Sequence, residues 1–192
     1  MNIILASGSP RRRQLLEQVG IPHTVLVSNA DETVTGKPQE QVQELALRKA
    51  KATHDISGKK GSLIIAADTL VFFNGEALGK PENKAQAVAM LSALQGQTHQ
   101  VYTGVAILKE GAQEVFYDMA EVTFHPLTQE EIAAYVKCGE PFDKAGAYGV
   151  QEKGAALVAR INGDFYTVMG LPISKVCRKL KEFGIDYWSL QP

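Results

Sequence analysis

A run of small and basic residues near the start of the chain has the composition of an anion site. Ser7-Gly8-Ser9-Pro10 is followed directly by Arg11, Arg12 and Arg13. The apolar residues before it are typical of a short buried strand, and Ser9-Pro10 is typical of a helix start, with Ser as the N-cap. Because a helix N-terminus presents unpaired N–H groups and the positive end of a dipole, this turn predicts a phosphate cradle. The alternative is a solvated basic first turn.

The three arginines cannot all face one ligand, because consecutive helical positions diverge by about 100°. Arg12 lies three and four residues before Leu15 and Leu16, in line with the apolar stripe of this helix. A charge on that stripe needs a partner. We therefore expect Arg12 to be the arginine that points inward.

A carboxylate follows the most apolar run of the chain. Residues 63–67 predict a strand buried on both faces, and Asp68 stands where the run ends. Ligands of α/β sheets gather beyond the carboxyl ends of strands, so Asp68 is a candidate for chemistry. An Asp that caps a turn is the other interpretation.

Two lysines are further candidates. Residues 38–54 have the spacing of an amphipathic helix, and Lys49 lies on or beside its apolar stripe, whereas Lys51 points away. A lysine there either extends along the apolar surface to water or binds an anion, and spacing leaves both open. Lys80 follows a hairpin predicted at Asn74-Gly75, which could return it to the ligand of Asp68. Gly79-Lys80-Pro81 does not have the spacing of a Walker P-loop.

The candidates together suit phosphoryl chemistry. Cations and a hydroxyl hold charged oxygens, while carboxylates bind a divalent metal or take a proton from water. The anion ligands would be Ser7, Arg11, Arg12, Lys49 and Lys80, and the carboxylates would be Glu32 and Asp68. The four histidines are scattered, without the spacing of a zinc site.

Composition limits the class of protein. The 192 residues suit one domain, residues 1–192, or one divided into two lobes, and the net charge of −1 argues against a general nucleic-acid binder. No apolar run approaches the roughly 20 residues that span a bilayer, and no export signal is evident. Cys138 and Cys177 are expected to be free, buried thiols of a reducing compartment. We expect a cytoplasmic protein that binds neither nucleic acid nor membrane.

The predicted elements mix βα units with hairpins, which favours an α/β fold. Residues 24–27 predict a strand, and residues 155–161 and 165–168 predict a hairpin around Asn162-Gly163. The segment 143–151 is rich in small residues and suits either a ligand-binding loop or a plain connection. We expect a mixed, elongated β-sheet flanked by helices, with two lobes and a central cleft.

The chain resembles the Maf proteins, which are nucleoside triphosphate pyrophosphatases, over essentially its whole length. The matching segments occur in the same order along the chain. They are residues 5–12, Asp31-Glu32, Lys49-Ala50, Ala67-Asp68-Thr69, Gly79-Lys80-Pro81, residues 143–149 with Gln151, and Gly170-Leu171-Pro172. Any one segment would be weak, but the whole set makes chance similarity improbable.

The resemblance implies hydrolysis of dTTP and UTP, and of related modified pyrimidine nucleotides, to a monophosphate and pyrophosphate. It implies an ITPase-like fold, a divalent cofactor (Mg²⁺ or Mn²⁺) near Glu32 and Asp68, and allows a homodimer. Asp68 would accept the proton from water, with Lys49, Lys80 and Glu32 as further catalytic residues. The substrate-binding residues would be Ser7, Arg11, Arg12, Thr69 and Gln151.

A regulatory protein is the alternative function. Maf relatives have been linked to septum formation and the arrest of cell division, and a nucleotide-binding regulator without turnover would use the same pocket. The sequence separates the two functions poorly for that reason, although an intact Asp68 and Lys80 favour the enzyme.

Overall fold

The computed structural model describes residues 2–58 and 61–190, and within these residues seven strands form one mixed sheet. The strands are β1 (Ile3–Leu5), β2 (Thr24–Val25), β3 (Leu63–Phe73), β4 (Glu76–Leu78), β5 (Thr98–Lys109), β6 (Ala112–Phe124) and β7 (Val158–Asn162). Their order is β2-β1-β3-β5-β6-β7, and β4 pairs with β3 off this path. The α/β class and the mixed sheet expected from the sequence are confirmed.

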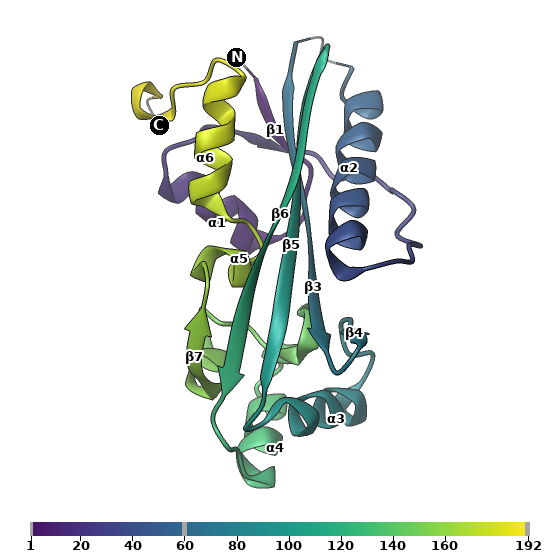
Figure 1. Ribbon diagram of the computed structural model, residues 1–192, viewed down its shortest axis with the longest axis vertical. Helices are drawn as coiled ribbons and strands as arrows, with labels where there is room; N and C mark the ends of the chain where they lie inside the picture. Colours follow the sequence, from purple (N-terminus) through teal and green to yellow (C-terminus); the bar gives the residue numbers. More distant parts are fainter. Residues whose placement is uncertain (1, 59–60, 191–192) are drawn as a thin grey trace. The chain divides into compact units, whose positions relative to one another are not determined.

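Helices follow single strands early in the chain and hairpins later in it (Figure 1). In the described residues the α-helices are α1 (Pro10–Gln18), α2 (Pro38–Ser57), α3 (Lys84–Leu94), α4 (Gln129–Lys137), α5 (Phe165–Met169) and α6 (Ile173–Glu182). Short 3₁₀ turns occupy much of the segment between α4 and β7. Helix α1 begins at Pro10, with Ser9 as its N-cap residue, as predicted.

The chain divides into two compact units, in agreement with the expected two lobes. Unit 1 comprises Met1–Asp68, Thr103–Asp118 and Gly170–Pro192. Unit 2 comprises Thr69–Tyr102 and Met119–Met169. The boundary at Asp68 falls inside β3, so this strand contributes to both units.

Unit 1 is built on parallel pairing of its first strands. Ile4 of β1 lies opposite Ile64 of β3 and opposite Thr24 of β2. In Figure 1, α2 lies on one side of these strands, and α1 and α6 lie on the other. Strand β1 and residues 63–67 of β3 are buried on both faces, which explains the continuous apolar sequence of residues 63–67.

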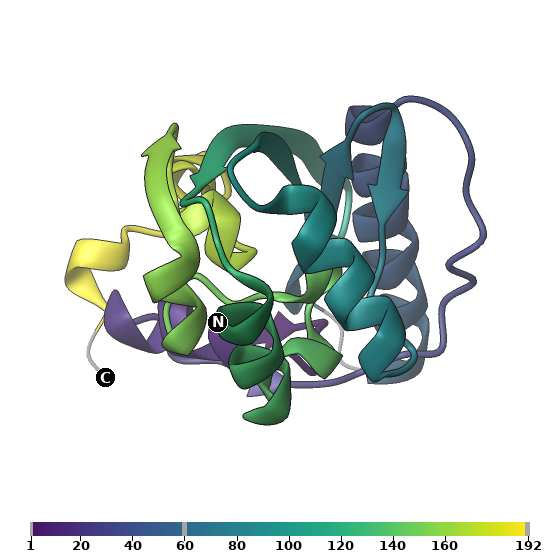
Figure 2. The same cartoon turned by 90° about the horizontal axis from the view of Figure 1, so that it is seen from below.

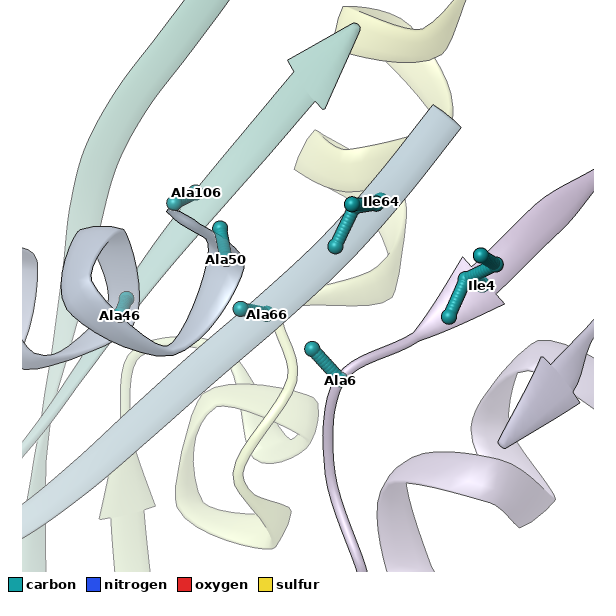
Figure 3. Close-up of a cluster of buried hydrophobic side chains, with 7 residues drawn as sticks. All are labelled: Ile4, Ala6, Ala46, Ala50, Ile64, Ala66 and Ala106. Carbon is teal, nitrogen blue, oxygen red and sulfur yellow. The ribbon is translucent and has the colours of Figure 1, made fainter. Parts of the chain in front are cut away.

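Small side chains let α2 approach the sheet closely. Figure 3 shows Ala46 and Ala50 of α2 beside Ala66 of β3 and Ala106 of β5, in a buried cluster. At Gly104 of β5 a Cβ atom would lie 2.2 Å from the carbonyl oxygen of Val42, which is a backbone atom of α2. A side chain at Gly104 would therefore push the helix away from the sheet.

Unit 2 contains α3 and α4, which pack against each other (Figure 2). Helix α4 begins with a capping box, in which Glu131 N–H donates to Thr128 Oγ1 and Thr128 N–H donates to Glu131 Oε2. The interior includes His99, Phe124 and Tyr148, whose rings meet edge to face.

Two predicted elements were wrong. The strand at residues 63–67 does not end before Asp68 but continues to Phe73, so Asp68 lies inside β3. Residues 165–168 form helix α5 rather than the second strand of a hairpin, and β7 pairs with β6 instead. Asp164 starts that helix, because its Oδ1 accepts from Tyr166 N–H at 2.9 Å.

The cysteines only partly match expectation. Both are free thiols, but Cys138 is exposed and only Cys177 is buried. Burial raises the pKa of the Cys177 thiol to about 11. Across the described residues, none of the helices is long and apolar enough to cross a membrane.

Candidate active site

The turn between β1 and α1 brings polar backbone and side-chain groups together around Ser7. The Ser7 hydroxyl accepts a hydrogen bond from Ser9 N–H at 3.2 Å and another from Arg12 Nη1 at 3.0 Å. Arg12 Nε donates to the carbonyl oxygen of Gly170 at 2.8 Å. The arginine is thus held at two points, and its planar fork is fixed beside the helix start.

Arg12 is the inward-pointing arginine, as its spacing from Leu15 and Leu16 predicted. Arg13 is exposed and pairs with Glu17 on the helix surface. Burial lowers the pKa of Arg12, while the nearby charge of Asp68 raises it; Arg11 lowers it and Glu32 raises it in turn. These influences indicate that both carboxylates and Arg11 act electrostatically on Arg12.

Lys49 joins the two candidate carboxylates. Its Nζ lies 2.6 Å from Oδ1 of Asp68 and 2.8 Å from Oε1 of Glu32. The side chains of Lys49 and Asp68 are 18% and 16% exposed, whereas that of Glu32 is 68% exposed. The Lys49 side chain therefore does not extend into water. Its ammonium group bridges two carboxylates in a position that is largely shielded from solvent.

The fold explains why this lysine and this aspartate meet. The pairing of β1 with β3 ends at Leu5 and Ile65, so Asp68 lies three residues beyond the last parallel partner. Beyond Ile65 the chain of β1 no longer pairs with β3 and continues toward Ser7. Helix α2 brings Lys49 to this part of β3 because its alanines and Gly104 let the helix lie close to the sheet.

Glu32 lies in the long loop between β2 and α2, which passes outside α2 in Figure 2. Arg48 of α2 ties this loop down, since its Nη1 donates to the carbonyl oxygen of Thr33 at 2.8 Å. Asp31 forms a local turn by accepting from Thr33 N–H at 2.9 Å. Arg48 Nη1 also donates to the carbonyl oxygen of Asp31 at 3.4 Å, so the loop is anchored to α2 on both sides of Glu32.

The other predicted site residues belong to unit 2. Thr69 follows Asp68 in β3 and is half-buried, Lys80 follows β4 and is exposed, and Gln151 is half-buried in the segment before β7. Gly146 N–H donates to the carbonyl oxygen of Gly79 at 3.1 Å, which joins the small-residue segment 143–151 to the residue before Lys80. This segment is folded against the rest of unit 2 and contains a short 3₁₀ turn.

Sequence reasoning about the chemistry missed two kinds of residue. Gly170 was quoted only as part of a resemblance, yet its carbonyl is the partner of Arg12. Glu140 was not singled out, although its carboxylate accepts from the backbone on one side of Gln151. The signal in both cases was weak, because a backbone carbonyl and a loop carboxylate carry no periodic pattern.

A divalent cation fits the pair of carboxylates only with further ligands. Within residues 2–58 and 61–190, no group of three or more His, Cys, Asp and Glu side chains is placed to hold a metal ion. Glu32 and Asp68 do converge on one positive charge, the Lys49 ammonium. Because Mg²⁺ is commonly held by one or two carboxylates together with substrate phosphates, these residues fit a metal that binds with a polyphosphate.

Comparison with known proteins gives a consistent result over nearly the whole chain. A family model described as Maf-like protein matches residues 2–183. The chain is 50% identical over 186 residues to proteins named dTTP/UTP pyrophosphatase from Bacillus anthracis and from Bacillus cereus, with 96% of each chain covered. The fold is similar to that of a HAM1 protein from Coxiella burnetii, with a TM-score of 0.51, 18% identity, and coverage of 95% of this chain and 99% of that one.

Proposed function

Because the chain belongs to the Maf-like protein family, we propose that it hydrolyses dTTP and UTP between the α and β phosphates. The products are the nucleoside monophosphate and pyrophosphate. The observation that best supports this function is the placement of Lys49 between Asp68 and Glu32, in the same unit as the Arg12–Ser7 pair. A proton acceptor and a group of phosphate ligands then occupy one unit.

Asp68 is proposed to take the proton of the attacking water. The role requires an ionised carboxylate that is held in place, and the 2.6 Å contact with Lys49 fixes one of its oxygens. The other oxygen then receives the proton as the hydroxide attacks the α phosphorus. The bond from that phosphorus to the bridging oxygen breaks, and pyrophosphate leaves.

The cations are proposed to bind the triphosphate. Arg12 presents a rigid guanidinium and Ser7 a hydroxyl, next to the start of α1, where the positive end of the helix dipole favours an anion. Arg11 and Lys80 would add positive charge. Such groups stabilise the charge that moves onto the leaving oxygens, which is commonly the largest contribution to catalysis of this kind.

The proposal includes a divalent cation held by Glu32 and Asp68 together with the substrate. When bound, that cation would neutralise charge on the phosphate oxygens. We further propose that the protein acts in the cytoplasm, without a nucleic-acid or membrane partner, and that it can form a homodimer.

Pyrimidine selectivity is assigned to Arg12, Thr69 and Gln151. An amide side chain offers one donor and one acceptor, which match the O4 acceptor and N3–H donor of a uracil or thymine edge. A wrong base would leave buried polar groups unpaired, at about 1–3 kcal/mol for each group. The proposed preference for dTTP and UTP therefore depends on how Gln151 is presented.

A panel assay on the purified full-length chain tests the function. Pyrophosphate release is measured with Mg²⁺ or Mn²⁺ for the common ribo- and deoxyribonucleoside triphosphates, and the nucleotide product is identified by chromatography. We expect release of pyrophosphate and monophosphate, with dTTP and UTP preferred. Binding of nucleotide without turnover would overturn the enzyme and leave the nucleotide-binding regulator, which the names of the relatives do not favour.

A further inference from the structure

The backbone on both sides of Gln151 is hydrogen-bonded to two side chains from earlier in the chain. Before Gln151, Gly149 N–H donates to the Tyr135 hydroxyl oxygen at 3.2 Å. After it, Gly154 N–H donates to Oε1 of Glu140 and Lys153 N–H donates to Oε2 of Glu140, each at 3.0 Å. The segment that carries Gln151 is therefore fixed at both ends.

The side chains of Tyr135 and Glu140 are hydrogen-bonded to each other. The Tyr135 hydroxyl donates to Oε1 of Glu140 at 2.9 Å, so the carboxylate accepts three hydrogen bonds and the phenol both donates and accepts. Tyr135 is buried at the end of α4, and burial followed by the bond to Glu140 raises the pKa of its phenol. The phenol stays protonated at neutral pH and keeps its donor role.

Close packing supports these bonds. A Cβ atom at Gly154 would lie 2.5 Å from the Gly149 carbonyl oxygen and 2.7 Å from the Tyr135 hydroxyl. A Cβ at Gly149 would lie 2.5 Å from Cε of Lys144. The buried Lys144 ammonium in turn contacts the carbonyl oxygen of Glu140 at 2.9 Å and the carboxylate of Glu152 at 3.3 Å.

Gln151 itself is held loosely. In the described residues its side chain makes one hydrogen bond, from Nε2 to Oε1 of Glu152, at the long distance of 3.5 Å. The direction in which its amide points therefore depends mainly on the backbone between Gly149 and Gly154. That backbone is what Tyr135 and Glu140 fix.

We propose that Tyr135 and Glu140 are positioning residues for base recognition, which hold the backbone of residues 149–154 so that the Gln151 amide is presented to the pyrimidine edge. This inference rests on the proposed function. A hydrogen-bonding site discriminates between bases only while its groups stay in place. A more mobile backbone at residues 149–154 should therefore reduce the selectivity between bases more than it reduces kcat.

The test compares Tyr135→Phe and Glu140→Gln with wild type in the full chain. Both variants keep the shape of the side chain. Tyr135→Phe removes the hydroxyl that accepts from Gly149 N–H, and Glu140→Gln replaces one of the two acceptor oxygens of the carboxylate with an amide NH₂ group. With UTP, we expect KM to rise about 5–10-fold and kcat to stay within about twofold, and the UTP-to-CTP ratio of kcat/KM to fall roughly tenfold. Cytosine is the probe because it reverses the donor and acceptor that Gln151 would meet.

Thr128→Ala is the matched control for a merely structural role. It removes the N-cap of the same helix, α4, without touching the bonds around Gln151. We expect it to lower the melting temperature but to leave the UTP-to-CTP ratio unchanged. If Tyr135→Phe and Glu140→Gln lowered kcat/KM for all nucleotides in parallel, as a loss of folded protein would, the positioning role would be overturned.

A double variant makes the test specific to Gln151. Gln151→Ala should lower the UTP-to-CTP ratio, and Tyr135→Phe in that background should lower it no further, since both changes remove the same recognition. Additive losses would contradict the inference. Failure of the proposed function would be distinguishable from failure of this inference, because the wild-type protein itself would then release no pyrophosphate from dTTP or UTP.

Discussion

Nζ of Lys49 lies 2.6 Å from Oδ1 of Asp68, and this contact joins helix α2 to strand β3. The same nitrogen lies 2.8 Å from Glu32. One ammonium group therefore separates two like charges and fixes the orientation of the proposed proton acceptor.

Removal of the Lys49 charge should impair turnover more than binding. In Lys49→Met the apolar stem is kept, but Asp68 and Glu32 face each other without a cation between them. We expect kcat for UTP to fall by about 10²-fold, the size of losing one preorganised charged group. Steady-state kinetics measure this, and Lys51→Met, at an exposed position on the same helix, is the control. Equal effects of the two changes would count against the bridge.

Arg12→Lys should weaken substrate binding despite the retained charge. The guanidinium uses Nε for the Gly170 carbonyl and Nη1 for Ser7, and a single ammonium nitrogen cannot hold both positions. We expect KM for dTTP and UTP to rise about tenfold, which corresponds to the loss of one good hydrogen bond. The exposed Arg13, changed to Lys, should leave KM unaltered, and an unchanged KM in Arg12→Lys would refute the assigned contact.

Gly104→Ala should both destabilise the protein and slow the reaction. The new Cβ would lie 2.2 Å from the carbonyl oxygen of Val42, so α2 must shift and carry Lys49 with it. We expect a loss of about 1–3 kcal/mol in the free energy of unfolding, as for overpacked cores. Urea denaturation measures it. Gly79→Ala is the stability control, because apart from its own chain neighbours no atom of the described residues would lie within 4 Å of the new Cβ.

The buried His99 should make stability depend on pH. Burial lowers its pKa from 6.5 to about 4, so the unfolded chain binds a proton there at a higher pH than the folded chain does. The contribution of neutral His99 to the free energy of unfolding is therefore fully present above about pH 6.5. This free energy decreases by on the order of 3 kcal/mol as the pH falls toward 4.

Urea denaturation at several pH values checks this prediction. Nδ1 of His99 is buried without a hydrogen-bond partner in the described residues, and Nε2 contacts the Tyr148 hydroxyl at 2.8 Å. A His99→Gln variant, which cannot titrate, should show a flatter dependence over the same range. A dependence as steep as that of wild type would assign the effect to other groups.

Local patterns in the sequence predicted the parts of the site that depend on helix and strand periodicity. The spacing of Arg12 from Leu15 and Leu16 gave its inward direction, and the apolar run before Asp68 located a buried strand. The end of that strand was wrong, because β3 extends through Asp68 after β1 has turned away. Residues 165–168 are mostly aromatic and β-branched, which predicted a strand, but Asp164 caps a helix there.

Contacts between distant residues could not be predicted in this way. Arg12 and the Gly170 carbonyl are 158 residues apart, and no pattern in the chain links them. The long, exposed loop of Glu32 has no periodicity, so its contact with Lys49 was not predicted. Lys49 was left between two interpretations because spacing gives the face of a helix but not what lies opposite it.

The central claim is that Asp68 accepts the proton of the attacking water, and Asp68→Asn tests it most directly. The amide keeps the shape of the side chain but is a very weak proton acceptor. In the pyrophosphate-release assay with UTP, we expect kcat to fall by roughly two to four orders of magnitude, with nucleotide binding retained in calorimetry. Asp55→Asn, at an exposed position of α2, serves as control. Turnover by Asp68→Asn within a few-fold of wild type would contradict the mechanism.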